Sequence, residues 1–142
     1  MAALSAPRMT DVLHGDHAVI QKIRVPIAAN VKIWQGALCM IDGGYLKPAA
    51  AATGKKVVGR SATTYDNTGG AAGAITCEVE RGTFGWDIGT SGDAIAQANV
   101  GAVVYAIDDH TVGLTDGTGT RSAAGIVWQL EDGLAFVESL GL

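Results

Sequence analysis

The sequence has few charged residues and no long apolar run, and each shortage excludes a class of protein. Charged side chains make up 17% of the 142 residues and hydrophobic ones 48%, so the chain is too apolar and too weakly charged to be disordered throughout. No apolar run approaches the roughly 18 residues that a membrane-spanning helix requires. We therefore expect a folded, soluble protein without a membrane partner.

Basic residues are also scarce. Ten lysines and arginines stand against 14 aspartates and glutamates, which gives a formal net charge of −4. A non-specific nucleic-acid binder needs a basic face that displaces counterions from phosphates, so we expect no nucleic-acid partner. Residues 1–17 contain one arginine and no sustained apolar stretch, so we expect no secretory signal.

The sequence contains two cysteines, Cys39 and Cys77, and neither belongs to a CxxC motif or to a zinc-ligand spacing. Each lies in an apolar stretch. A disulfide or a reactive thiol is the alternative, but we expect both cysteines to be buried as small apolar residues.

Glycine is abundant. The chain has 20 glycines in 142 residues, about twice the usual frequency of roughly 7%. Glycine inside a helix costs about 1 kcal/mol relative to alanine, so this composition favours strands and turns over long helices. Low charge and high apolar content in a small all-β chain also predict a homo-oligomer.

Short alternating segments separated by turn residues predict about eight or nine strands. Between residues 19 and 27, apolar side chains alternate with Lys22 and Arg24, and Pro26 places this strand at a sheet edge or ends it. In the segment 125–130 the alternation puts Trp128 in the core. The other predicted strands cover residues 31–41, 55–60, 75–80, 103–107, 110–115 and 134–137, with tight turns at 42–44 and 131–133 and one helical turn over 93–99.

These elements predict an all-β fold, a small β-barrel or β-sandwich with at most one or two short helical turns. Residues 1–18 show no stable periodicity and are expected to form a flexible N-terminal arm, poorly ordered unless something holds it. Residues 19–142 are expected to form a single β-rich domain.

Two clusters contain residue types that bind metals or transfer protons. His14, Asp16 and His17 lie within four residues of one another, but their surroundings do not favour a helix that would bring them together, so we interpret them as part of a solvated arm. Asp108, Asp109 and His110 are adjacent on a tight turn, where we expect the three side chains to diverge.

No other pattern indicates catalysis. Glu78 and Glu80 lie on the same face of a predicted strand, and a strand with one solvent-exposed face produces this pattern without any catalytic role. The serines lie in no GxSxG elbow, and the glycines at 69–73 lack the Gly-Lys-Ser/Thr ending of a phosphate loop. We therefore expect no enzyme activity, no metal, no cofactor and no small-molecule substrate.

The segment 100–115, VGAVVYAIDDHTVGLT, resembles the bacteriophage capsid cement proteins, also called head decoration proteins, which carry a similar vGxxVYxxDDxTV segment. Other similar elements follow in the same order over residues 30–138. They are Gly36-Ala37-Leu38, Asp42-Gly43-Gly44-Tyr45, Val57-Val58-Gly59, Asp66-Asn67 and Ala124-Gly125-Ile126-Val127.

The resemblance implies a small β-rich, β-tulip-like subunit that trimerises on the outer surface of an icosahedral phage head. There it would bind the major capsid protein and cement its hexamers, in a virion assembled in the host cytoplasm. Arg8, Lys22 and Arg24 are candidate capsid contacts, because an arm that orders along a capsid edge could present them to capsid carboxylates.

Two alternatives remain open. A spike or fibre base that binds a receptor predicts an exposed aromatic groove around Trp34 or Trp86. A small β-barrel hydrolase predicts converging carboxylates, for which Glu78, Glu80 and Asp109 are the candidates.

Overall fold

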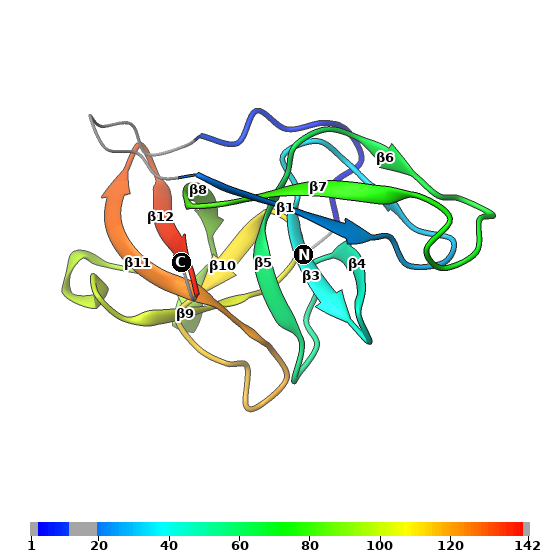
Figure 1. Cartoon of the computed structure of the whole chain (residues 1–142). Helices are drawn as coiled ribbons and strands as arrows, with labels where there is room; N and C mark the ends of the chain where they lie inside the picture. The colour runs from blue at the N-terminus through cyan, green and yellow to red at the C-terminus, as the bar shows by residue number, and fades with distance from the viewer. Residues whose placement is uncertain (1–2, 12–19, 141–142) are drawn as a thin grey trace.

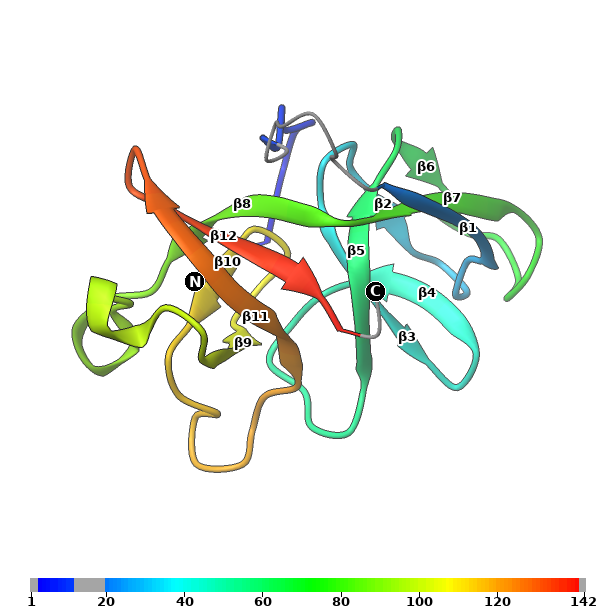
Figure 2. The ribbon, with the colours of Figure 1, turned by 60° about the vertical axis from the view of Figure 1, so that its left-hand side comes forward.

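The computed structural model describes residues 3–11 and 20–140, and it confirms the all-β prediction. Two β-structures lie side by side (Figures 1 and 2). One is an antiparallel five-stranded sheet in the order β1-β7-β5-β3-β4, and the other is a closed barrel in the order β10-β8-β12-β11-β9. A short ribbon of β2 and β6 completes the described strands.

The strand bounds follow the predicted segments closely at most places. They are β1 (Gln21–Pro26), β2 (Lys32–Ile33), β3 (Leu38–Asp42), β4 (Tyr45–Pro48), β5 (Lys56–Ser61), β6 (Tyr65–Asp66), β7 (Thr76–Arg81), β8 (Thr83–Ile88), β9 (Val103–Ala106), β10 (Thr111–Gly113), β11 (Ala123–Glu131) and β12 (Leu134–Ser139). In the described residues, no helix is long and apolar enough to cross a membrane.

Both predicted tight hairpins are confirmed. Gly43 and Gly44, with φ of 60° and 91°, turn β3 into β4, and Asp132 and Gly133, with φ of 53° and 76°, turn β11 into β12. Positive φ at both central residues matches the twist of the flanking strands, and glycine supplies it without a steric penalty. β1 is an edge strand, as Pro26 predicts.

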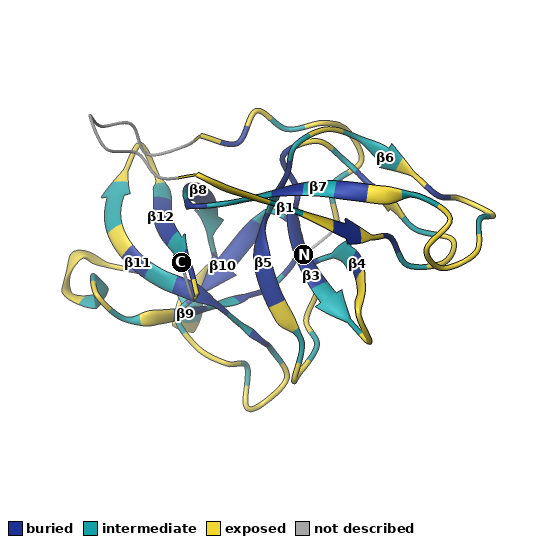
Figure 3. Ribbon diagram, in the orientation of Figure 1, coloured by how far each residue is buried: buried dark blue, intermediate teal, exposed yellow. Residues whose placement is uncertain are grey.

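Two hydrophobic cores hold these strands together (Figure 3). The first fills the barrel and continues onto one face of the five-stranded sheet through Leu38, Met40 and Val57. The second covers the opposite face of that sheet and includes Cys39 and Cys77.

Both cysteines are buried and unpaired, which confirms their prediction as apolar core residues. Burial raises the pKa of the Cys77 thiol to about 11 and raises that of Cys39 further above its usual value. Both side chains are therefore neutral thiols at neutral pH, and such thiols are poor nucleophiles.

The prediction that Trp128 lies in the core is wrong, because 49% of this residue is exposed. Its neighbour Val127 points inward instead. A five-stranded barrel has a narrow interior. Trp86 on β8, only 2% exposed, already occupies the barrel core opposite Ala135, so the inward positions of β11 must be small.

Two other local expectations also need correction. The sequence predicts no strand in the glycine-rich segment 82–92, yet β8 runs through it and pairs with both β10 and β12. The predicted helical turn at 93–99 is replaced by two short 3₁₀ turns, Ser91–Asp93 and Gln97–Asn99. Asp93 does not cap a helix, because its carboxylate accepts hydrogen bonds from Thr115 and Arg121.

Gly125 makes the barrel closure sensitive to a single methyl group. At its φ of +155°, an added Cβ would lie 2.0 Å from the Glu138 carbonyl oxygen on β12. We expect Gly125→Ala to lower the free energy of unfolding by at least about 2 kcal/mol. Gly92→Ala is the control, because nothing lies within 4 Å of its added Cβ. Chemical denaturation of both variants checks this, and equal midpoints would contradict it.

Candidate functional site

The N-terminal segment, residues 3–11, is held against the barrel. The Leu4 N–H donates to Asp109 Oδ1 at 2.8 Å, and the Gly85 N–H of β8 donates to the Asp11 carbonyl at 2.8 Å. The expected flexible arm of residues 1–18 is therefore corrected over residues 3–11, because backbone hydrogen bonds fix them to the domain. Residues 12–18 lie outside the described residues.

Arg8, a predicted capsid contact, is used within the chain. Its guanidinium makes a two-pronged ion pair with Asp87, at 3.1 and 3.3 Å, and lies 6.0 Å from the ring centroid of Trp86. Its backbone N–H donates to the Gln35 carbonyl at 2.7 Å. These contacts place Arg8 as an anchor of the N-terminal segment on β8.

Gly36, between β2 and β3, allows the N-terminal segment to pass close to the backbone of the domain. An added Cβ on Gly36, at a φ of +81°, would lie 2.0 Å from the Arg8 carbonyl oxygen. The buried Thr10 hydroxyl donates to the Gly36 carbonyl at 2.6 Å. Only a residue without a side chain fits at this crossing.

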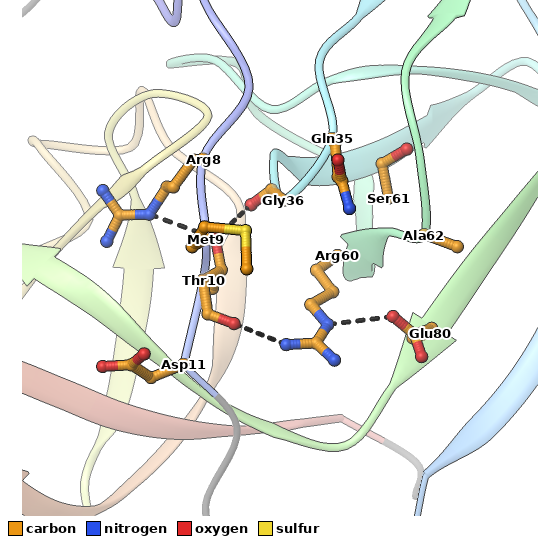
Figure 4. Close-up of a pocket in the computed structure, with 10 residues that line it drawn as sticks. All are labelled: Arg8, Met9, Thr10, Asp11, Gln35, Gly36, Arg60, Ser61, Ala62 and Glu80. Carbon is orange, nitrogen blue, oxygen red and sulfur yellow. Dashed lines mark hydrogen bonds and ion pairs between the residues drawn. The ribbon is translucent and has the colours of Figure 1, made fainter.

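A cavity of about 240 Å³ lies beside the crossing (Figure 4). In its wall, Arg60 Nε donates to Glu80 Oε1 at 3.0 Å, and Arg60 Nη1 donates to the Thr10 carbonyl. The Arg60 guanidinium also lies 4.4 Å from the ring centroid of Phe84. Arg60 thus pairs with Glu80 across the wall and also holds the backbone of the N-terminal segment through the Thr10 carbonyl.

Lys22 and Arg24, the other predicted capsid contacts, are exposed on edge strand β1. Antiparallel pairing sets Lys22 opposite Glu80 and Arg24 opposite Glu78, so both pairs lie on the same face of the sheet. In the part of the chain that the structure describes, neither cation forms an ion pair within 4.0 Å. This edge presents both cations to solvent.

Asp108, Asp109 and His110 converge, so the expectation that they diverge is wrong. His110 Nδ1 lies 3.1 Å from Asp108 Oδ1 and 3.1 Å from Asp109 Oδ1. The chain tightens here because the His110 N–H donates to Asp108 Oδ1 at 3.0 Å, which folds the turn between β9 and β10 back on itself. An aspartate two residues before such a donor is the signal that could have predicted it.

The carboxylates considered for a hydrolase do not all belong to one site. Glu80 pairs with Arg60 on the sheet, whereas Asp109 lies in the barrel turn and accepts a hydrogen bond from Leu4. The cluster of His14, Asp16 and His17, interpreted from the sequence as part of a solvated arm, lies outside the described residues.

An apolar strip crosses the outer face of the barrel. Val103 of β9 pairs directly with Ile126 of β11, and Trp128 lies two residues further along β11, at the register irregularity between Val127 and Gln129. Val103 and Trp128 are 40% and 49% exposed. We call these three residues the barrel strip. By contrast, Trp86 is buried, so it cannot form the exposed aromatic groove that a receptor-binding alternative requires.

No family model, curated protein or solved structure matches this chain.

Gly36 gives a direct test of how the N-terminal segment is held. We expect Gly36→Ala to displace the segment, speed amide exchange over residues 8–11 and lower the free energy of unfolding by about 1–3 kcal/mol relative to Gly44→Ala. Gly44 also has positive φ but an added Cβ there meets nothing within 4 Å, so it controls for backbone strain alone. Hydrogen exchange checks the result, and equal exchange in both variants would contradict the assignment.

Proposed function

We propose that this chain is a structural virion protein that binds the outside of an icosahedral phage head as a trimer and cements the major capsid protein hexamers. The observation that carries the proposal is the barrel strip, in which Val103 and Trp128 are exposed apolar side chains on neighbouring strands of the barrel. Exposed apolar surface of this kind marks a protein–protein contact.

The position of the resembling segment supports a structural role. VGAVVYAIDDHTVGLT spans β9, the following turn and β10, which are barrel elements. Val104, Ala106 and Val112 from this segment are fully buried in the first core. The shared residues thus build the fold, as expected for a protein whose shape is its function.

A trimer explains how weak contacts could suffice. Three copies joined by one symmetric interface turn the second and third capsid contacts into intramolecular events, which raises the overall affinity without new contacts. In this proposal the barrel strip forms the interface between the three copies of the trimer. Edge strand β1, with its exposed cations Lys22 and Arg24, binds the capsid by strand addition and by ion pairs with acidic groups.

The first test concerns the oligomer. We expect a solution mass near three times the 14.5 kDa of one chain, and we expect Trp128→Ser to shift the equilibrium toward monomers because the strip loses its largest apolar side chain. Tyr45→Ser is the matched control, since Tyr45 is an exposed aromatic on β4, away from the barrel. Light scattering measures both. A monomeric wild-type chain would contradict the trimer.

The second test concerns the capsid. We expect saturable binding to undecorated heads, and we expect Lys22→Glu with Arg24→Glu to weaken it at least about tenfold, more at low than at high salt. Lys32→Glu with Lys56→Glu, at exposed cations on β2 and β5, is the control, because it reverses the same number of charges. Co-sedimentation with the heads measures binding. Equal losses in the double variant and the control would remove β1 from the interface, and no binding by the wild-type chain would overturn the proposal.

A further inference from the structure

The turn between β9 and β10 buries more negative charge than its neighbours balance. Only 7% of the Asp108 side chain and 2% of the Asp109 side chain are exposed. Among the described residues, His110 is the one basic side chain within ion-pair distance of either. Buried carboxylates are costly unless a cation or hydrogen-bond donors compensate them, and here the backbone N–H groups of Leu4 and His110 each donate to one carboxylate oxygen.

The three side chains point at a common space. His110 Nδ1 and one oxygen from each carboxylate all lie within 4.8 Å of one another, and both Nδ1–Oδ1 distances are 3.1 Å. Zinc bound to histidine nitrogen and aspartate oxygen at about 2.0–2.2 Å in a tetrahedron sets its ligands roughly 3.3 Å apart. The cluster is therefore already close to the spacing that such an ion requires.

A second observation points to a missing partner. Asp108 Oδ1 accepts the His110 backbone N–H at 3.0 Å, but Asp108 Oδ2 is fully buried and accepts no hydrogen bond in the described part of the chain. Native structures rarely leave a buried carboxylate oxygen unpaired, and an absent ion is one of the recognised explanations. This oxygen belongs to the same side chain that faces His110.

We propose that Asp108, Asp109 and His110 bind a divalent transition-metal ion of the zinc type. Imidazole nitrogen and carboxylate oxygen suit such ions, and two carboxylates balance the charge of one divalent cation. The ion lies between His110 Nδ1 and the two carboxylates. The His110 side chain, 20% exposed, gives access from solvent, and one coordination position is left for water.

The site would lock three parts of the molecule together. Asp109 Oδ1 also accepts the Leu4 N–H, and the Asp109 carbonyl accepts the Leu38 N–H of β3 at 2.7 Å. A metal that fixes Asp109 therefore holds the N-terminal segment and the five-stranded sheet against the barrel turn. Metal binding should accordingly slow exchange of the Leu4 amide and raise the melting temperature.

Titration calorimetry with ZnCl₂ near neutral pH tests the proposal. The protein is the full chain, stripped with a chelator and carrying His14→Asn and His17→Asn, so that these imidazoles contribute nothing. We expect one zinc ion per chain and a higher melting temperature with zinc than with chelator. In the same background, Asp108→Asn should weaken zinc binding at least about tenfold, whereas Asp132→Asn, an exposed turn aspartate with positive φ, should leave it unchanged.

His110→Gln provides a second variant that does not depend on a buried position. It should also weaken zinc binding at least about tenfold, and Co²⁺ bound to the parent background should give visible absorption bands that this variant loses. Absence of zinc binding in the parent, or unchanged affinity in both His110→Gln and Asp108→Asn, would overturn the proposal.

Discussion

The narrow interior of the five-stranded barrel is the constraint on which most of this structure depends. Trp86 fills it from β8, with Phe84 packed edge-on at 6.4 Å, and the facing strands supply small residues such as Ala135 and Ala106. Two aromatic side chains packed against small residues of the facing strands let five strands close around them. A second tryptophan cannot enter, so Trp128 lies outside, and the outer face of the barrel acquires the apolar strip that the proposed trimer uses.

Close backbone crossings are the second constraint. At Gly36, Gly59 and Gly125, an added Cβ would lie 2.0 Å from a carbonyl oxygen of a neighbouring segment. The first crossing joins the N-terminal segment to the domain, and the other two join strands within the sheets. The abundance of glycine therefore does more than supply turns, because three of these residues permit contacts between distant parts of the chain.

Much of the strand pattern could be predicted, because it depends on local alternation and turn chemistry. The hairpins at Gly43-Gly44 and Asp132-Gly133, the edge position of β1 and the burial of Cys77 all follow from residues within a few positions. β8 could not be predicted in this way, because Gly82, Gly85 and Gly89 interrupt its pattern and long-range pairing with β12 stabilises it. For the same reason the sequence predicted Arg8 as a capsid contact and gave no sign of its ion pair with Asp87, which lies 79 residues away.

The sequence by itself determined that this chain is built of short strands, since glycine content, alternation and positive-φ turn residues act over a few residues. Only the tertiary structure decided which tryptophan is buried, where the N-terminal segment lies and that Asp108, Asp109 and His110 face one another. Those outcomes depend on barrel size and on contacts between residues far apart in the chain. A local sequence pattern contains no information about barrel size or long-range contacts. It indicates that the two faces of a strand differ in polarity, but it does not specify which other segment packs against each face.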